Sequence, residues 1–326
     1  NDGDNDIFVG ERLKVNCYGL PGSGYLLENK SNNKFILSDQ PALKNLGLIT
    51  DSKSFDINND GWYDLVVSGE WMPITILINN KGTFINSTDK YGLQNSTGLW
   101  STLAIADVDN DGNQDIIAGN AGENNFFKGG LRMYVNDFDR NGSFEQIICY
   151  RKDNSDYPIV DRDELLSQIP SLKTKLLKFK DYGKATINTI FNKTTIDESL
   201  VYQATNFKTT LFLNKEGKFS NFELPREIQY SSVKAIKVAD INNDGVKDII
   251  FGGNQYLMKP QFGRDDASKG WVVYGSDHNK FHFTSVKSLG IFGQIRDFKI
   301  TEIKKKKILI TAINNEKIQF NDIQNQ

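Results

Sequence analysis

The chain has 326 residues, of which 38% are hydrophobic and 7 are proline, so it can bury a sizeable core and is not expected to be disordered. Its 39 basic and 41 acidic side chains give a formal net charge of −2, which offers no support for bulk binding of nucleic acid. The sequence shows neither an apolar run as long as a membrane span nor a signal peptide. Cys17 and Cys149 form no metal-binding spacing, and we expect both to be buried apolar residues rather than a disulfide.

A motif rich in Asp, Asn and Gly recurs along the chain. The opening residues, NDGDNDIFVG, resemble its second half, so we expect the chain to begin inside a repeat of a longer precursor. Four complete copies follow, and they begin at Asp56, Asp107, Asp137 and Asp240. Each copy reads D-x-[DN]-x-[DN]-G-x-x-[DE] and runs into a short stretch rich in β-branched residues, which predicts a strand.

The repeated motif predicts a calcium loop, because it places side-chain oxygens at positions 1, 3, 5 and 9 around a glycine that permits a sharp turn. Position 12 is apolar instead of the Glu of an EF-hand, which favours calcium loops of a β protein. The alternative is a metal-free hairpin turn, since the same residues favour turns. Four copies in one register favour about four calcium ions. The predicted ligands, with position 7 contributing its backbone carbonyl, are Asp56, Asn58, Asp60, Trp62, Asp64, Asp107, Asp109, Asp111, Asn113, Asp115, Asp137, Asp139, Asn141, Ser143, Glu145, Asp240, Asn242, Asp244, Val246 and Asp248.

The four loops are not expected to be equivalent. The Asp107 loop has carboxylates at all four side-chain positions, so we predict that it binds calcium most tightly. The Asp137 loop, with Asn141 and Glu145, is the least regular copy.

Several short strands follow each loop, and the units recur at about 50 residues, which predicts a single all-β domain folded as a β-propeller over 1–326. Seven blades is the best estimate, and six or eight remain open. The expected blades lie near 1–37, 51–85, 101–136, 137–151, 199–220, 235–283 and 293–320, with the first one truncated.

One segment departs from the strand pattern. Residues 161–191 have apolar side chains at helical spacing, which predicts a helical insertion over about 158–192, with Pro170 separating two helices. We interpret it as a cap packed on the propeller rim, with a partner-binding element as the alternative.

Few residues outside the loops suggest chemistry. His278 and His282 lack the neighbours that would complete a metal site, and KKKK at 304–307 is typical of a solvated hairpin turn. No catalytic motif is present, so no catalytic residue is predicted. A possible ligand face is formed by Trp71, Arg264, Asp265, Asp266 and Trp271, although turn and core roles explain the same residues.

These repeats resemble the FG-GAP/VCBS blades of integrin-alpha-type propellers. The chain is also similar to bacterial VCBS-repeat proteins grouped with the cartilage acidic protein and ASPIC/UnbV families. The segments that carry this resemblance include GEWMPITILIN (69–79), AGNAGENN (118–125), YVNDFDRNGSFE (134–145), ELLSQIPSLK (164–173), LPREIQYSSVKAI (224–236) and GRDDASKGWVVYG (263–275). The resemblance implies a secreted or cell-surface calcium-binding propeller within a larger protein, and it brings no known catalytic residue.

The sequence therefore predicts an extracellular, non-enzymatic binding module for protein or polysaccharide ligands, in which calcium is structural. It would be secreted by a bacterium or associated with the outer membrane. A carbohydrate-active enzyme, either a lyase or a glycoside hydrolase, is the alternative. A third possibility is a structural fragment whose partner is another domain of its precursor. Neither nucleic acid nor a membrane span is expected.

Overall fold

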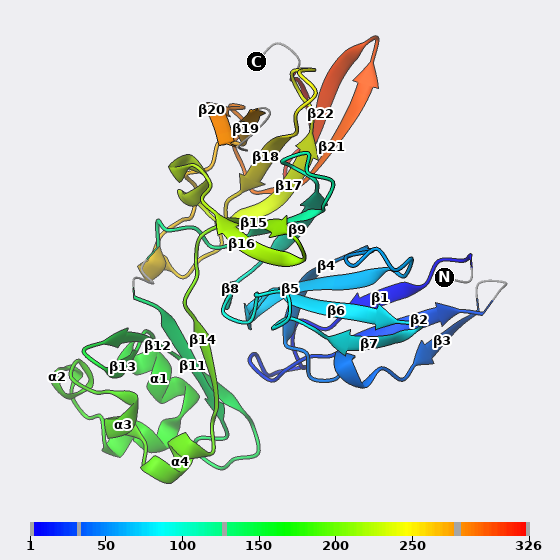
Figure 1. Ribbon diagram of the computed structural model, residues 1–326. Helices are drawn as coiled ribbons and strands as arrows, with labels where there is room; N and C mark the ends of the chain where they lie inside the picture. Colours follow the sequence, from blue (N-terminus) through cyan, green and yellow to red (C-terminus); the bar gives the residue numbers. More distant parts are fainter. Residues whose placement is uncertain (1–2, 31–33, 126–128, 277–281, 324–326) are drawn as a thin grey trace.

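The chain folds into antiparallel β-sheets with a small group of helices (Figure 1), as the all-β prediction requires. The computed structural model describes residues 3–30, 34–125, 129–276 and 282–323. Within these ranges the strands form six sheets.

The sheets are numbered here by their first strand. The first contains β1 (Ile7–Gly10), β2 (Gly24–Asn29) and β3 (Phe35–Ser38). The second contains β4 (Leu48–Phe55), β5 (Asp64–Met72), β6 (Thr75–Asn80), β7 (Thr83–Asn86) and β8 (Gly98–Leu99). The third contains β9 (Thr102–Ala106), β10 (Asp115–Gly119), β15 (Thr210–Lys215) and β16 (Lys218–Phe222).

The remaining strands form three more sheets. The fourth contains β11 (Leu131–Asn136), β12 (Glu145–Lys152), β13 (Ser155–Pro158) and β14 (Leu200–Ala204). The fifth contains β17 (Val233–Ala239), β18 (Asp248–Gly253), β19 (Trp271–Ser276) and β20 (His282–Ser288). The sixth contains β21 (Ile295–Ile303), β22 (Lys306–Ile313) and β23 (Gln319–Asp322).

Five of the sheets follow one another in an arc. Their first strands, β1, β4, β9, β17 and β21, contact each other in this order, so they form the inner side of the arc. The first sheet and the sixth sheet stand at its two ends (Figure 1). Each sheet thus presents its first strand inward and its later strands outward, which is how propeller blades are built.

Buried apolar side chains fill the spaces between successive sheets. Between the second and third sheets, Trp100 and Phe212 meet edge to face with ring centroids 5.8 Å apart, and Ile76 packs in the same cluster. Similar clusters join the third sheet to the fifth and the fifth to the sixth. The hydrophobic effect therefore ties each blade to the next one.

Along the chain, the segment that forms the fourth sheet is inserted between strands β10 and β15 of the third sheet. This arrangement differs from the predicted blade boundaries. Strand β10 pairs with β15, placing Ile116 opposite Phe212, although about 90 residues separate the two strands. The segments 137–151 and 199–220, predicted as separate blades, instead supply the fourth sheet and the outer half of the third. The predicted count of seven blades is not confirmed, since the described residues form six sheets. A repeat period cannot reveal an insertion between two paired strands.

The helices cover the fourth sheet. They are α1 (Arg162–Gln168), α2 (Phe179–Tyr182), α3 (Ile187–Ile190) and α4 (Lys193–Asp197), and the 3₁₀ turns are η1 (Pro41–Leu43), η2 (Pro170–Thr174), η3 (Arg226–Gln229) and η4 (Pro260–Phe262). Asp161 caps α1 by accepting a hydrogen bond from the backbone N–H of Glu164 at 2.8 Å. Leu165 and Ile187 pack on Ile147 and Cys149 of β12.

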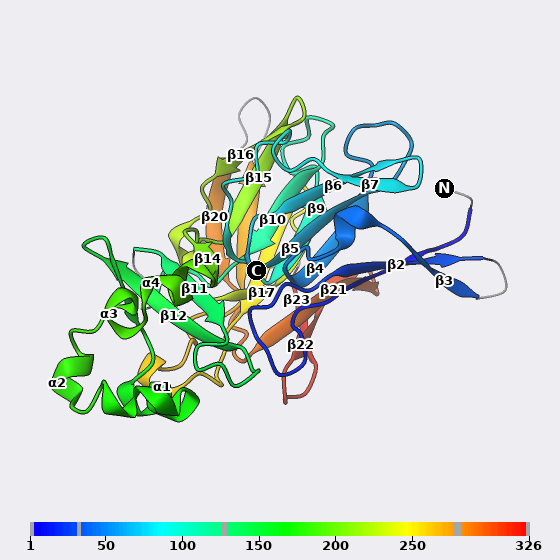
Figure 2. The ribbon, with the colours of Figure 1, turned by 90° about the horizontal axis from the view of Figure 1, so that it is seen from below.

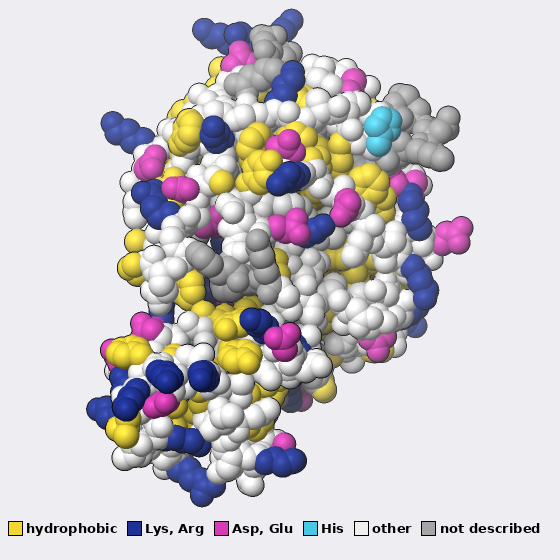
Figure 3. All heavy atoms as spheres, turned by 90° about the vertical axis from the view of Figure 1, so that its left-hand side faces the viewer, with side chains coloured by type: hydrophobic (Ala, Val, Ile, Leu, Met, Phe, Trp, Pro, Cys, Tyr) yellow, Lys and Arg dark blue, Asp and Glu magenta, His cyan; other side chains and the backbone are white. Residues whose placement is uncertain are grey.

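The helical insertion expected over about 158–192 thus runs, in the structure, from Arg162 to Asp197. Its apolar side chains pack on the fourth sheet, and Figure 2 shows the helices beside β11 and β12. It touches the arc through the ion pair of Glu164, in α1, with Lys259, in the connection between β18 and β19. Lysine and arginine side chains gather on the surface of this lobe in Figure 3. The helical segment contains six exposed lysines, namely Lys173, Lys175, Lys178, Lys180, Lys184 and Lys193.

Candidate functional site

The first carboxylate of each repeated loop holds the turn together. In the loop between β9 and β10, Asp107 accepts hydrogen bonds from the backbone N–H groups of Asp111 at 3.1 Å and Gly112 at 3.0 Å. Asp56 and Asp137 make the same two bonds to positions 5 and 6 of their own loops. In the last loop, Asp240 bonds to positions 4 and 6. The turn therefore fixes the first predicted ligand before any ion binds.

The backbone conformation of the loops favours particular residues at positions 4 and 6. Asn110 has φ +54° and Gly112 has φ +91°, both in the left-handed region. The other three loops repeat positive φ values at positions 4 and 6. Gly holds position 6 in all four loops and Asn holds position 4 in three of them, because these residues adopt this conformation at the lowest cost. In the Asp137 loop, Arg140 adopts it at position 4.

The ninth position carries a buried carboxylate that connects the loop to its sheet. Asp115 is 0% exposed. It accepts from the backbone N–H of Val108 at 2.9 Å and from that of Asn214, on the neighbouring strand β15, at 2.8 Å. Asp64 and Asp248 repeat this pair of bonds within their own sheets.

Two more residues occupy the same structural place. Glu145, in the fourth sheet, accepts from the backbone N–H of Phe138 at 2.9 Å. Asp6, in the incomplete opening copy, accepts from Asn29 N–H at 2.9 Å, as Asp64 does from the matching residue of β6. The partial motif at the start of the chain therefore adopts this part of the loop geometry.

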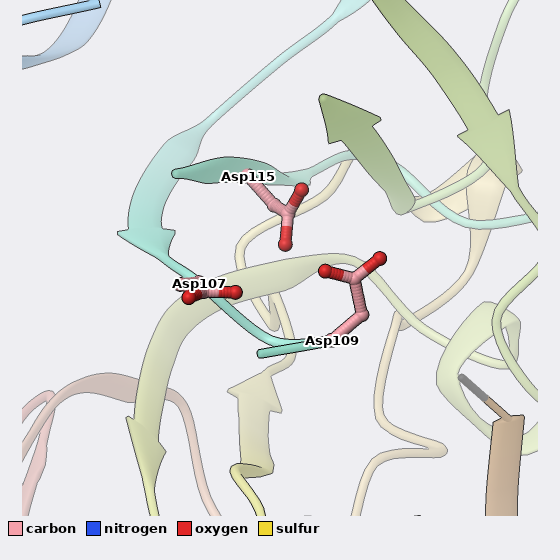
Figure 4. Close-up of side chains that lie close together, drawn as sticks. All are labelled: Asp107, Asp109 and Asp115. Atoms are coloured by element: carbon pink, nitrogen blue, oxygen red, sulfur yellow. The ribbon is translucent and has the colours of Figure 1, made fainter. Parts of the chain in front are cut away.

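Carboxylate oxygens converge in two of the loops. One group contains Asp107, Asp109 and Asp115, and Figure 4 shows their carboxylates gathered around a common space. The other contains Asp137, Asp139 and Glu145. Within each group the potential ligand atoms lie within 4.8 Å of one another, which is close enough for one cation to contact all three.

Two oxygens of these groups have no hydrogen-bond partner among the described residues. They are Oδ1 of Asp109 and Oδ1 of Asp139, and both atoms are buried. The side chain of Asp109 is only 5% exposed. Burying a carboxylate oxygen without a partner is costly, so an unpaired oxygen at the third position of a calcium-type loop fits the role of a metal ligand.

The Asp56 and Asp240 loops use an amide at the third position. Asn58 Nδ2 donates to Asp60 Oδ2 at 2.9 Å, and Asn242 Nδ2 donates to Asp244 Oδ2 at 2.7 Å. The two loops in which three carboxylates converge are those that keep an Asp at this third position, Asp109 and Asp139. Side-chain amide oxygens also bind calcium, so the residues still fit the predicted ligand set.

Burial and mutual repulsion oppose ionisation of the ninth-position acids. Burial, assisted by the negative charges of Asp109 and Asp111, raises the pKa of Asp115 to about 7. The pKa values of Asp64, Glu145 and Asp248 are raised too, with burial as the largest cause in each case. A bound cation would offset both effects, since it favours the charged form.

A lysine from another part of the third sheet reaches the Asp107 loop. Lys215 Nζ forms ion pairs with Asp109 and with Asp111, the latter at 2.8 Å. Lys215 follows Asn214, whose backbone N–H bonds to Asp115. The residues that match Lys215 in the second and fifth sheets are Asn80 and Ser276. Sequence reasoning missed this lysine because it lies 106 positions from Asp109 and belongs to no motif.

The possible ligand face is only partly assembled. Arg264, Asp265 and Asp266 are neighbours in one loop, where Arg264 lies 4.0 Å from the ring centroid of Tyr256 and 3.6 Å from Asp266. Trp71 is 4% exposed and donates its indole N–H to Tyr18, so it takes the core role weighed as the alternative.

Trp271, partly exposed, packs against the core cluster of the third and fifth sheets. Its indole nitrogen is buried without a partner among the described residues. The two tryptophans therefore belong to different core clusters.

Three other sequence features can be placed. Cys17 and Cys149 are free and buried, as predicted. Lys304 and Lys305 have positive φ and form the turn between β21 and β22. His282 is exposed on β20, with Nε2 3.0 Å from Ser276 Oγ, while His278 lies outside the described residues.

Comparison with known proteins supports the repeat assignment. Residues 56–118 match the sequence model of the FG-GAP-like repeat, a segment that includes the Asp56 and Asp107 loops. A search of curated proteins found no match. The closer similarity to the cartilage acidic protein and ASPIC/UnbV group is not confirmed. None of the described helices has the length and apolar character needed to cross a membrane.

Proposed function

We propose that the protein is an extracellular calcium-binding β-propeller that acts as a binding module for protein or polysaccharide ligands. The observation that carries the calcium assignment is the recurrence of one loop geometry in four places, two of which gather three carboxylates around a common space. The FG-GAP-like repeat and the arc of five sheets support the propeller. The secreted location is inferred from the resemblance of the repeats to integrin-type blades.

The chemistry of the ligand set favours calcium over softer metals. Every predicted ligand atom is an oxygen, which suits a hard cation, and the loop offers more protein oxygens than magnesium normally uses. The ion would be structural, because the ninth-position carboxylate joins the loop to a neighbouring strand. An ion that binds only the folded loop stabilises the sheet by mass action.

Thermal unfolding and calorimetric titration test the calcium assignment. Full-length protein is unfolded in calcium, in magnesium and in chelator, and the bound ions are counted by titration. We expect a higher Tm in calcium than in magnesium, with about four ions bound. An equal Tm in calcium and chelator would contradict the proposal.

Single substitutions then place the ions. Asp109→Asn and Asp139→Asn each remove a carboxylate with an unpaired oxygen, and each should remove or weaken one calcium site. Asp153→Asn is the matched control, because Asp153 is exposed in a turn outside the loops.

The binding role is tested separately, by screening calcium-loaded protein against immobilised polysaccharides and extracellular proteins. Hydrolase and lyase assays on any polysaccharide that binds decide between a binding module and the carbohydrate-active enzyme. Turnover would establish the enzyme, and retention without turnover supports the binding module.

A further inference from the structure

The inner strands of the arc carry β-bulges at matching places. The register shifts between Ile49 and Asp51 in β4, between Val233 and Ala235 in β17, and between Ile295 and Asp297 in β21. The extra residues are Thr50, Lys234 and Arg296. A bulge leaves its extra residue unpaired and redirects its side chain, and such bulges are common beside binding sites.

Side chains at the inner edge link each blade to the next. Thr50 donates its hydroxyl to the backbone carbonyl of Trp100 at 3.0 Å, at the start of the third sheet. Ser101 then donates to the carbonyl of Val233, which precedes the bulge of the fifth sheet. In these two places a short polar side chain thus donates a hydrogen bond to a backbone carbonyl of the next blade.

Lys234 holds the corresponding position in the fifth sheet, but within the part of the chain that the structure describes it does not donate a hydrogen bond to a backbone carbonyl of the sixth sheet. Among the described residues none accepts a hydrogen bond from its ammonium group. The carbonyl that would continue the series, that of Ile295, already accepts from Arg296 Nη1 at 3.0 Å. Lys234 is intermediate in exposure as a residue, while its ammonium group lies in a desolvated position.

Charges from several sheets converge around Lys234. Arg12, Glu70, Asp265 and Arg296 all lie within electrostatic range of its ammonium group. They come from the segment after β1, from β5, from the loop before β19 and from β21. This convergence places Lys234 at the inner side of the arc, where the blades meet.

The two carboxylates of this group already have other partners. Glu70 forms an ion pair with Arg12 at 2.7 Å and accepts from the Tyr18 hydroxyl at 2.9 Å. Asp265 accepts from the Ser231 hydroxyl and from the backbone N–H of Ser232, the latter at 3.0 Å.

Among the described residues, the acceptors that hold Arg296 are all neutral. Its guanidinium donates to the Asn254 carbonyl at 3.0 Å, to Gln255 Oε1 at 3.1 Å and to Gln294 Oε1 at 3.2 Å. Burial lowers the pKa values of both Arg296 and Lys234. Of these five groups three are cations and two are anions, and among the described residues neither Lys234 nor Arg296 forms an ion pair with a carboxylate.

We propose that Lys234 and Arg296 form a binding site for one carboxylate group of a ligand, of the kind carried by sugar acids and by peptide chain ends. The ammonium of Lys234 supplies free N–H donors, and Arg296 supplies a second positive charge held in place by its neutral partners. The excess of a single positive charge matches a monoanion better than a dianion such as phosphate.

This inference rests on the proposed binding function and deepens it, because it assigns a chemical class to the ligand. It is tested by a readout that is independent of the calcium loops. The number of calcium ions and the Tm are measured on the same samples, so a failure of the carboxylate site leaves the calcium assignment unaffected.

The experiment is a ligand-observed NMR titration of the full chain in calcium. The probes are glucuronate and N-acetylglycine, compared with glucose, N-acetylglycinamide and inorganic phosphate. We expect at least one carboxylate probe to bind, with an affinity at least tenfold higher than those of its neutral counterpart and of phosphate. Binding of glucuronate alone identifies a sugar acid, and binding of N-acetylglycine alone identifies a peptide chain end.

Variants decide whether Lys234 is responsible. Lys234→Met should weaken carboxylate binding at least tenfold, whereas Lys234→Arg keeps the charge and should retain most of it. Lys237→Met is the matched control, since Lys237 lies on the same strand and is also partly exposed. If Lys234→Met fails to fold in calcium, Lys234→Gln replaces it. The inference is overturned if neither carboxylate binds, if neutral probes or phosphate bind equally well, or if a folded neutral variant retains wild-type affinity.

Discussion

Lys215 Nζ lies 2.8 Å from Oδ2 of Asp111, and it also pairs with Asp109 in the same loop. The side chain of Lys215 is 52% exposed, so it can swing away from the loop. The charge of Lys215 offsets the repulsion among the loop carboxylates. Burial would raise the pKa of Asp111, but hydrogen bonds from Lys215 and Asn113, together with the charge of Lys215, lower it overall. Any calcium ion in this loop must compete with an internal cation.

Lys215→Met should therefore increase the calcium affinity of the Asp107 loop. We expect about a tenfold gain, ~1.4 kcal/mol, because the ion no longer displaces an ammonium group. Calorimetric titration measures it. Lys218→Met, in the same β15–β16 hairpin, is the control and should leave all affinities unchanged. The gain should disappear when Lys215→Met is combined with Asp109→Asn, and a gain that persists would contradict competition in this loop.

Without metal, the ionisation of Asp115 should make stability depend on pH. Burial raises its pKa from 3.8 to about 7 in the folded chain. Between these values the unfolded chain releases the proton and the folded chain retains it, so the contribution of Asp115 to stability is lost as the pH rises from about 4 to about 7. The loss approaches ~4 kcal/mol when the full shift is expressed.

Urea unfolding in chelator, at several pH values, tests this expectation. The free energy of unfolding of the wild type, relative to that of Asp115→Asn, should decrease over this pH range, because the variant has no proton to lose. A constant difference between the two proteins would contradict the assignment of the raised pKa to Asp115.

The inter-blade hydrogen bond of Ser101 should contribute to stability. Ser101→Ala removes the only side-chain donor that this residue offers to Val233, and it should lower the free energy of unfolding by about 1–2 kcal/mol. Urea unfolding in saturating calcium measures the loss. Ser220→Ala, on the exposed side of β16, should have little effect. Equal stability of the two variants would show that the blades are not coupled through this bond.

The sequence predicted what is local in this structure. The sharp turn at Gly112 follows from residue type, and the helical segment follows from the spacing of its apolar residues. The sequence did not predict contacts that join distant segments. The pairing of Ile116 with Phe212, and the ion pair of Lys215 with Asp109, depend on which strands become neighbours. Nor could it show that Trp71 is core, since an aromatic residue suits a ligand face or an interior equally well.

The helical insertion and the Asp137 loop should depend on each other. Phe138, the second residue of the loop, packs against Phe191 with ring centroids 4.4 Å apart, and its backbone N–H holds Glu145 at 2.9 Å. Phe191→Ala would leave a cavity beside Phe138 and should destabilise the insertion by about 3–5 kcal/mol. The ninth-position carboxylate would then be less well positioned, so the variant should bind one calcium ion fewer, or more weakly, in a calorimetric titration.

The control for this prediction is Phe179→Ala, because Phe179 belongs to the same insertion but is 65% exposed. It should retain the calcium stoichiometry of the wild type. The loops that begin at Asp56 and Asp240 lie in other sheets, so their calcium binding should survive Phe191→Ala. Loss of all sites together would mean that the fourth sheet supports the whole arc, while loss of none would mean that the Asp137 loop is held by its own turn, through the bonds of Asp137 to Asn141 and Gly142.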